Sequence, residues 1–287
     1  MSNVMYSKTG ESIFIYLKSP YTDKYTRYEF LRVENNRINY DCWKILYIHI
    51  CDKDLNPLYE SLPGGCECEG ALRELFEDGS VASDFIGGYH GDERMTKLTV
   101  LVDGKELDMS KDYGLTDCES VQAIVESCLF RVDSSEKVFD RIRVDTWTSE
   151  GVEIKNHYTT TAKIKIERAA LSLIGICVRE ENYGELISEH WDNMSDSWME
   201  ICDFDHHHTE CKATGFVEAR MRGLIDVHLN TYDYKVNGVA TSPFGHFSYQ
   251  AYTPKRIKIY VDPFSYRSLD VGDVFDCTSF QSIFARA

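Results

Sequence analysis

Short runs of alternating apolar and polar residues recur along most of the chain. The clearest of them cover residues 139–147, 152–159 and 161–167. Successive side chains of a β-strand point to opposite faces of the sheet, so a period of two predicts half-buried strands. We therefore expect an all-β fold, specifically a large antiparallel β-sandwich of the jelly-roll or supersandwich type, with one or two short helices.

Further apolar runs, rich in aromatic and β-branched residues, predict additional strands. They lie at residues 12–17, 28–33, 43–50, 97–102, 121–132, 223–229, 256–261 and from 274 onward. Residues 171–178 fit either a buried strand or a short buried helix. Residues 70–78 place Ala71, Leu72 and Leu75 on one side of a helix, so we expect a short helix there, ended by Gly79.

The chain carries no sequence sign of a division into domains. It has no internal repeat, no heptad run and no low-complexity linker, and its six prolines form no hinge-like cluster. A chain of 287 residues, 43% of them hydrophobic, can bury a substantial core. We therefore expect a single β-sandwich domain over residues 1–287.

Charge and hydropathy narrow the classes of partner. The net charge is −16, with 47 acidic against 31 basic residues, so we expect no nucleic-acid partner, because binding a duplex needs a basic face. A local basic cleft for an anionic substrate is still compatible with this charge. No apolar run reaches the length of about 18 residues that a membrane span requires, so we expect no membrane partner.

The first residues and the cysteines indicate the compartment in which the protein is made. Residues 1–7 lack a basic stretch followed by an apolar segment, so we expect no signal peptide and synthesis in the cytoplasm. The sequence leaves open whether the protein later associates with a virion or is released from the cell. Of the ten cysteines, Cys51, Cys128 and Cys177 sit inside apolar strand-like runs, where a free cysteine behaves as a small hydrophobe. We expect reduced cysteines.

The densest concentration of chemically useful side chains is the stretch from Asp84 to Arg94, which reads Asp-Phe-Ile-Gly-Gly-Tyr-His-Gly-Asp-Glu-Arg. Its glycines allow the chain to turn sharply around His90. A strand predicted at 97–102 would anchor one side of the turn. A turn alone does not call for histidine, carboxylates and arginine together, so we interpret this stretch as functional.

Part of this stretch, Gly-Gly-Tyr-His-Gly-Asp-Glu, resembles the first zinc motif of the metallocarboxypeptidase and aspartoacylase clan. The resemblance implies His90 and Glu93 as zinc ligands, a later histidine as the third ligand, and a metal-activated water. In that clan the motif leads into a helix of an α/β sheet, whereas here a strand is predicted to follow. We expect no bound metal and no other cofactor.

The same stretch, the strand-rich remainder and the terminal residues 272–284 resemble β-sandwich polysaccharide lyases of gut bacteria and phage tails. This resemblance implies β-elimination on a uronate polysaccharide, which needs a base, an acid and a group that neutralises the uronate carboxylate. The catalytic candidates are His90 as base, Tyr89 or Tyr158 as acid, and Arg94 or Asn156 as neutralising group, with Glu93 beside them.

The candidate substrate-binding residues are Asp92, Asn156, His157 and Trp147. On a strand, Asn156 and Tyr158 share one face while His157 points to the other. Trp147 fits either a sugar platform or the core. Asp92 and Glu93 could serve glycoside cleavage, but adjacent residues usually point apart. The cluster around His206, His207 and His208 fits either a metal site or a solvated loop.

We therefore expect a polysaccharide-active protein, specifically a lyase that cleaves a uronate-containing polysaccharide by β-elimination. The alternatives are a zinc-dependent hydrolase that uses His90 and Glu93, and a non-catalytic carbohydrate-binding or phage structural protein.

Overall fold

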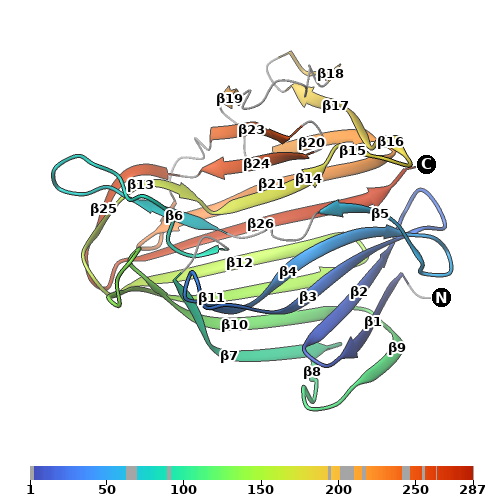
Figure 1. Ribbon diagram of the computed structural model, residues 1–287, viewed down its shortest axis with the longest axis horizontal. Coiled ribbons are helices and arrows are strands. Elements are labelled where there is room, and N and C mark those ends of the chain that lie inside the picture. Colours follow the sequence, from blue (N-terminus) through green and yellow to red (C-terminus); the bar gives the residue numbers. More distant parts are fainter. Residues whose placement is uncertain are drawn as a thin grey trace.

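The computed structural model describes residues 3–62, 70–88, 92–192, 195–200, 210–214, 218–240, 246–253, 256–262 and 264–286. Within these ranges every regular element is a β-strand and nearly all strand pairs are antiparallel, which confirms the predicted all-β sandwich (Figure 1). No helix in the described ranges is long and apolar enough to cross a membrane.

The first layer consists of β1 to β5, which follow one another in the sequence, with β9 added at the edge beside β1. Strand order in it is β9-β1-β2-β3-β4-β5, all antiparallel. Beside β5 lies a four-stranded sheet of order β14-β24-β23-β19 (Figure 1). The bounds are β1 (Val4–Thr9), β2 (Ser12–Lys18), β3 (Tyr25–Asn35), β4 (Tyr40–Cys51), β5 (Pro57–Leu62), β9 (Tyr113–Cys118), β14 (Ser172–Cys177), β19 (Glu210–Thr214), β23 (His246–Thr253) and β24 (Arg256–Asp262).

The second layer is a longer antiparallel sheet of order β7-β10-β11-β12-β26-β21-β20-β17-β18. Its strand bounds are β7 (Glu93–Val102), β10 (Val121–Phe130), β11 (Lys137–Thr148), β12 (Gly151–Thr160), β17 (Ile187–Asp192), β18 (Ser197–Glu200), β20 (Glu218–Gly223), β21 (Ile225–Val236) and β26 (Val274–Ala285). A small sheet is formed by β6 (Ala71–Glu74), β13 (Ile164–Ala170) and β25 (Phe264–Leu269). A separate pair is formed by β15 (Arg179–Glu180) and β16 (Gly184–Glu185). The short edge strands are β8 (Lys105–Glu106) and β22 (Val239–Ala240).

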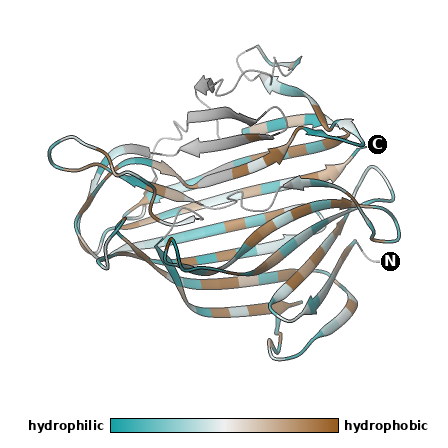
Figure 2. Ribbon diagram, in the orientation of Figure 1, coloured by the Kyte–Doolittle hydropathy of each residue, from teal (hydrophilic) through white to brown (hydrophobic). Residues whose placement is uncertain are grey.

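The two layers enclose a common core. The ring of Phe30 on β3 packs edge-on against Trp147 on β11, with ring centroids 5.4 Å apart, and both side chains are completely buried. At one end the layers are joined by a parallel pairing of Asp41 on β4 with Arg94 on β7. Figure 2 shows hydrophobic and hydrophilic residues alternating along the strands of the second layer, as the period-two runs predict.

The helix predicted over residues 70–78 is wrong. Ala71–Glu74 form strand β6, which pairs with β13. The backbone N–H of Leu72 donates to the carbonyl of Ile86 at 3.0 Å, and Ile86 donates back at 2.7 Å. Partners distant in the sequence thus satisfy the backbone groups, and these tertiary contacts override a weak local helical pattern.

Strand β11 reverses the usual distribution of charge between the faces of a sheet. Arg141, Arg143 and Asp145 point into the interior and are at most 2% exposed, whereas Ile142 between them is 43% exposed. Arg143 pairs inside with Asp145 at 2.7 Å. The interior of the sandwich therefore contains ion pairs as well as apolar side chains. Polar residues that the sequence suggests for a site can thus lie in the core.

Candidate functional site

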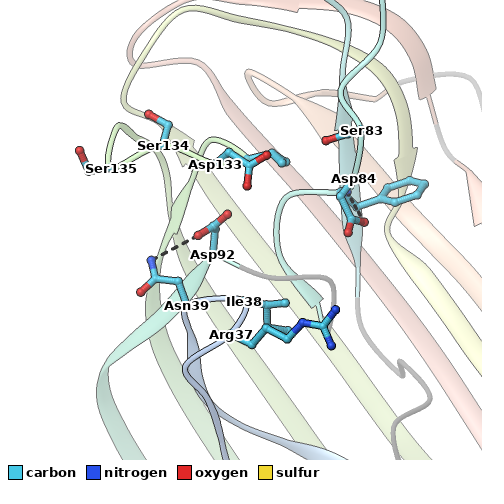
Figure 3. A pocket seen from close by; sticks show the side chains of 11 residues that line it. Arg37, Ile38, Asn39, Ser83, Asp84, Asp92, Asp133, Ser134 and Ser135 are labelled. Carbon is cyan, nitrogen blue, oxygen red and sulfur yellow. Dashed lines mark hydrogen bonds between the residues drawn. The ribbon is translucent and has the colours of Figure 1, made fainter.

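A pocket of about 590 Å³ opens at the end of the sandwich where turns from both layers meet (Figure 3). The first layer contributes the turn between β3 and β4, and the second layer contributes the turn between β10 and β11. The segment between β6 and β7, which includes part of the glycine-rich stretch, forms the rest. We call this cavity the turn pocket; it is lined by Arg37, Ile38, Asn39, Ser83, Asp84, Phe85, Asp92, Val132, Asp133, Ser134 and Ser135.

Asp92 is held in this pocket by backbone hydrogen bonds to both layers. Its N–H donates to the carbonyl of Ile38 and its carbonyl accepts from the N–H of Phe130, both at 2.8 Å. Its φ of 51° lies in the left-handed region, which residues other than glycine adopt seldom. Asn39 Nδ2 donates to the Asp92 carboxylate at 3.2 Å (Figure 3). The side chain is therefore fixed at the junction of the two layers.

The pocket carries more negative than positive charge. The carboxylates of Asp84, Asp92 and Asp133 lie around it together with the guanidinium group of Arg37 (Figure 3). Partial burial raises the pKa of Asp92, hydrogen bonds from the Asn39 side chain and from the Asp133 backbone oppose that rise, and the negative charge of Asp133 adds to it. Such a cavity can accept hydrogen bonds from several hydroxyl groups at once.

Glu93, adjacent to Asp92, points the opposite way, into the core. Its carboxylate pairs with the guanidinium group of Arg141 at 3.1 Å and accepts a hydrogen bond from Ser127 Oγ at 2.6 Å. Glu93 and Arg141 are each about 1% exposed. The carboxylate is thus neutralised inside the sandwich as one half of a buried ion pair, and the zinc-ligand and catalytic roles of Glu93 stay predictions.

Asn156 and Tyr158 do share one face of β12, as predicted, but that face is the buried one. Asn156 Oδ1 accepts two hydrogen bonds from Arg141, at 3.0 and 2.7 Å. The Tyr158 ring stacks on Phe275 with centroids 4.4 Å apart. Burial raises the pKa of Tyr158 to about 12. Neither side chain reaches solvent, so their predicted roles as neutralising group and acid are not supported.

Arg141 is the central residue that sequence analysis missed. Its guanidinium group contacts Glu93 and Asn156 and lies 5.4 Å from the centroid of the Tyr158 ring. The structure therefore brings three predicted site residues together, but around a buried cation in the closed core. The alternation of arginine and apolar residues in β11 was the available signal, and it does not reveal which face is buried.

The remaining predicted residues lie in three different surroundings. Trp147 is completely buried, so its ring offers no face to a sugar and belongs to the core. His157 is 44% exposed on the opposite face of β12, and its Nδ1 lies 2.7 Å from Asp276 Oδ1. Arg94 is exposed, lies over the Phe130 ring at 5.9 Å and donates to Asn39, which in turn holds Asp92.

Tyr89 and His90 lie outside the described residues, as does the cluster of His206, His207 and His208. Among the residues that the structure describes, no group of three or more histidine, cysteine, aspartate or glutamate side chains could hold a metal ion. Cys51, Cys128 and Cys177 are free, as expected.

No protein-family model and no curated protein matches this chain. Among solved structures, the chain is similar to the Slr1438 protein from Synechocystis sp. PCC 6803, with 6% identity and a TM-score of 0.46 over 99% of this chain and 96% of that one. It is also similar to a galactose mutarotase-like protein from Clostridium acetobutylicum, with 10% identity and a TM-score of 0.44 over 98% of each chain.

Proposed function

We propose that this protein binds a saccharide in the turn pocket. The observation that carries the proposal is the lining of that cavity, which combines carboxylates, an amide, a guanidinium group and serine hydroxyls with the ring of Phe85. A volume of about 590 Å³ falls within the usual range for small-molecule sites, about 300–1,000 Å³. The pocket lies where rigid strands end, so its polar groups converge from fixed positions.

Sugar recognition needs both kinds of hydrogen-bonding group in one small space. Sugar hydroxyls donate to carboxylates such as Asp84 and Asp92 and accept from donors such as Arg37. Hydrogen bonds that involve a charged group are the stronger kind. The apolar face of a sugar ring can pack on an aromatic ring, and Phe85 lines the cavity for that contact.

The charge of the pocket favours a neutral sugar over a uronate. Asp84, Asp92 and Asp133 would repel a substrate carboxylate, and among the described residues of the lining they outnumber the one cation, Arg37. The finer expectation, β-elimination on a uronate, stays a prediction, because its proposed base His90 lies outside the described residues. An unsaturated uronate product absorbs near-ultraviolet light, so incubating the protein with uronate polymers tests that chemistry directly.

Replacing Asp92 by asparagine should weaken binding of a neutral oligosaccharide by about tenfold or more, because a hydrogen bond to a charged acceptor is lost. The measurement is calorimetric titration of the wild-type protein with a panel of neutral oligosaccharides, repeated with Asp92→Asn for those that bind. Asp54→Asn is the matched control, since it changes the net charge equally at an exposed residue that does not line the pocket.

Two results would overturn this proposal. If no neutral oligosaccharide in the panel binds, the protein is not a binder of neutral sugars. If Asp92→Asn binds as tightly as the wild type, the saccharide site lies elsewhere.

The affinity for the neutral oligosaccharide should also fall as the pH is lowered. The pKa of Asp92 is raised above its ordinary value of 3.8, chiefly by burial, so the carboxylate takes up a proton at a higher pH than an exposed aspartate. Above that pKa the ionised group accepts hydroxyl hydrogen bonds on both oxygens, and below it one oxygen is protonated. Titrations from pH 7 downward should show this step in the wild type, and the Asp92→Asn variant should lack it.

A further inference from the structure

A second cavity system lies far from the turn pocket, where β20, β21 and the end of β26 run side by side near the C-terminal end (Figure 1). Two adjoining cavities, of about 580 and 410 Å³, share Arg222 and Arg286 in their lining and so form one groove. We call it the arginine groove; the lining residues used in the argument are Arg220, Arg222, Arg286, Trp198 and Tyr21.

The groove gathers cationic groups in a chain that is otherwise acidic. The sequence has 31 basic against 47 acidic residues, yet three arginines line this one site. Each pairs with a carboxylate: Arg220 with Glu218 at 2.6 Å, Arg222 with Glu189 at 2.6 Å, and Arg286 with Asp226 at 3.1 Å. A guanidinium group carries several N–H donors in a planar fork, and these pairs use only part of them.

One wall of the groove is aromatic and held in place. The guanidinium group of Arg222 lies 4.1 Å from the centroid of the Trp198 ring, which makes a cation–π contact. Trp198 in turn packs edge-on against Trp191, with centroids 5.4 Å apart. Tyr21 adds a ring that is 58% exposed. These contacts hold the guanidinium group of Arg222 next to apolar surface. A ligand that contacts both the guanidinium group and the apolar surface therefore does not have to immobilise these side chains when it binds.

We propose that the arginine groove binds an acidic saccharide through the carboxylate of a uronate ring. The guanidinium forks of Arg222 and Arg286 match a planar carboxylate, and the exposed ring of Tyr21 can pack on the apolar face of the sugar ring that carries it. The two sites differ in their cations: Arg37 accompanies three aspartates in the lining of the turn pocket, whereas three arginines line the groove beside Glu185, Glu189 and Asp226. We therefore assign neutral sugars to the turn pocket and uronates to the arginine groove. This inference rests on residues separate from those of the proposed function.

The test is calorimetric titration with a trimer of galacturonate, using a neutral galactose trimer and sodium sulfate for comparison. The galacturonate trimer should bind the wild type, and Arg286→Ala and Arg222→Lys should each weaken it by about tenfold or more, because a charge-assisted hydrogen bond is lost. Arg222→Lys keeps the positive charge of the side chain but removes the planar set of guanidinium N–H donors. The affinity should fall at high salt.

The control variant is Arg32→Ala, which removes a partly exposed, ion-paired arginine of β3 and changes the net charge as Arg286→Ala does. It should bind the galacturonate trimer as the wild type does. Asp92→Asn should also leave binding of the galacturonate trimer unchanged. This variant therefore distinguishes failure of the groove proposal from failure of the proposal that the turn pocket binds a neutral saccharide. Unchanged binding by both groove variants would overturn the inference, as would equally tight binding of sulfate or of the neutral trimer at the groove. Matching unfolding temperatures confirm that the variants fold.

Discussion

Replacing Arg141 by alanine should lower the free energy of unfolding by about 3–5 kcal/mol. The guanidinium group is about 1% exposed and neutralises Glu93, which is equally buried. Removing it takes away the cation that pairs with this buried carboxylate, and it also removes two hydrogen bonds to Asn156. Urea unfolding followed by tryptophan fluorescence gives the free energies of both proteins.

Two further variants separate the ion pair from general damage to the core. Arg32→Ala, at a partly exposed pair, should cost about 1 kcal/mol or less. Arg141→Met combined with Glu93→Leu removes both charges, keeps apolar volume, and should regain a large part of the loss. If Arg141→Ala is as stable as the wild type, the Arg141–Glu93 ion pair does not stabilise the core, which contradicts its burial between the layers.

Trp147→Ala should be destabilising by a similar amount, about 3–5 kcal/mol, because it opens a cavity in a packed core. The Trp147 ring is completely buried and packs against Phe30. Trp147→Phe keeps an aromatic ring and should cost less. Under conditions where it remains folded, Trp147→Phe should bind neutral oligosaccharide as the wild type does. Weaker binding without a loss of stability would mean that Trp147 is a sugar platform after all.

The strand pattern made the fold class predictable, but not which face of each strand is buried. Alternation in β12 correctly separates Asn156 and Tyr158 from His157, because the period of a strand is fixed by its geometry. It does not say that the face of Asn156 is the inner one. In β11 the inward face carries Arg141, and the exposed face carries Ile142, because partners on neighbouring strands neutralise the charge.

The candidate site was predictable only in part, for a similar reason. The stretch from Asp84 to Arg94 does contribute Asp84, Phe85 and Asp92 to the turn pocket. The groups opposite them, Arg37 and Asp133, belong to turns elsewhere in the sequence. Their meeting depends on how the two layers join, and no local pattern reports that.

The most direct test of saccharide binding in the turn pocket is hydrogen exchange with and without the neutral oligosaccharide that binds most tightly. Backbone amides of residues 37–39, 83–85 and 132–135 should exchange more slowly in the complex, because they belong to the turns that line the pocket. Those in the arginine groove should be unchanged. Protection confined to the groove, or absent from all three turns, would contradict the assignment of the turn pocket as the saccharide site.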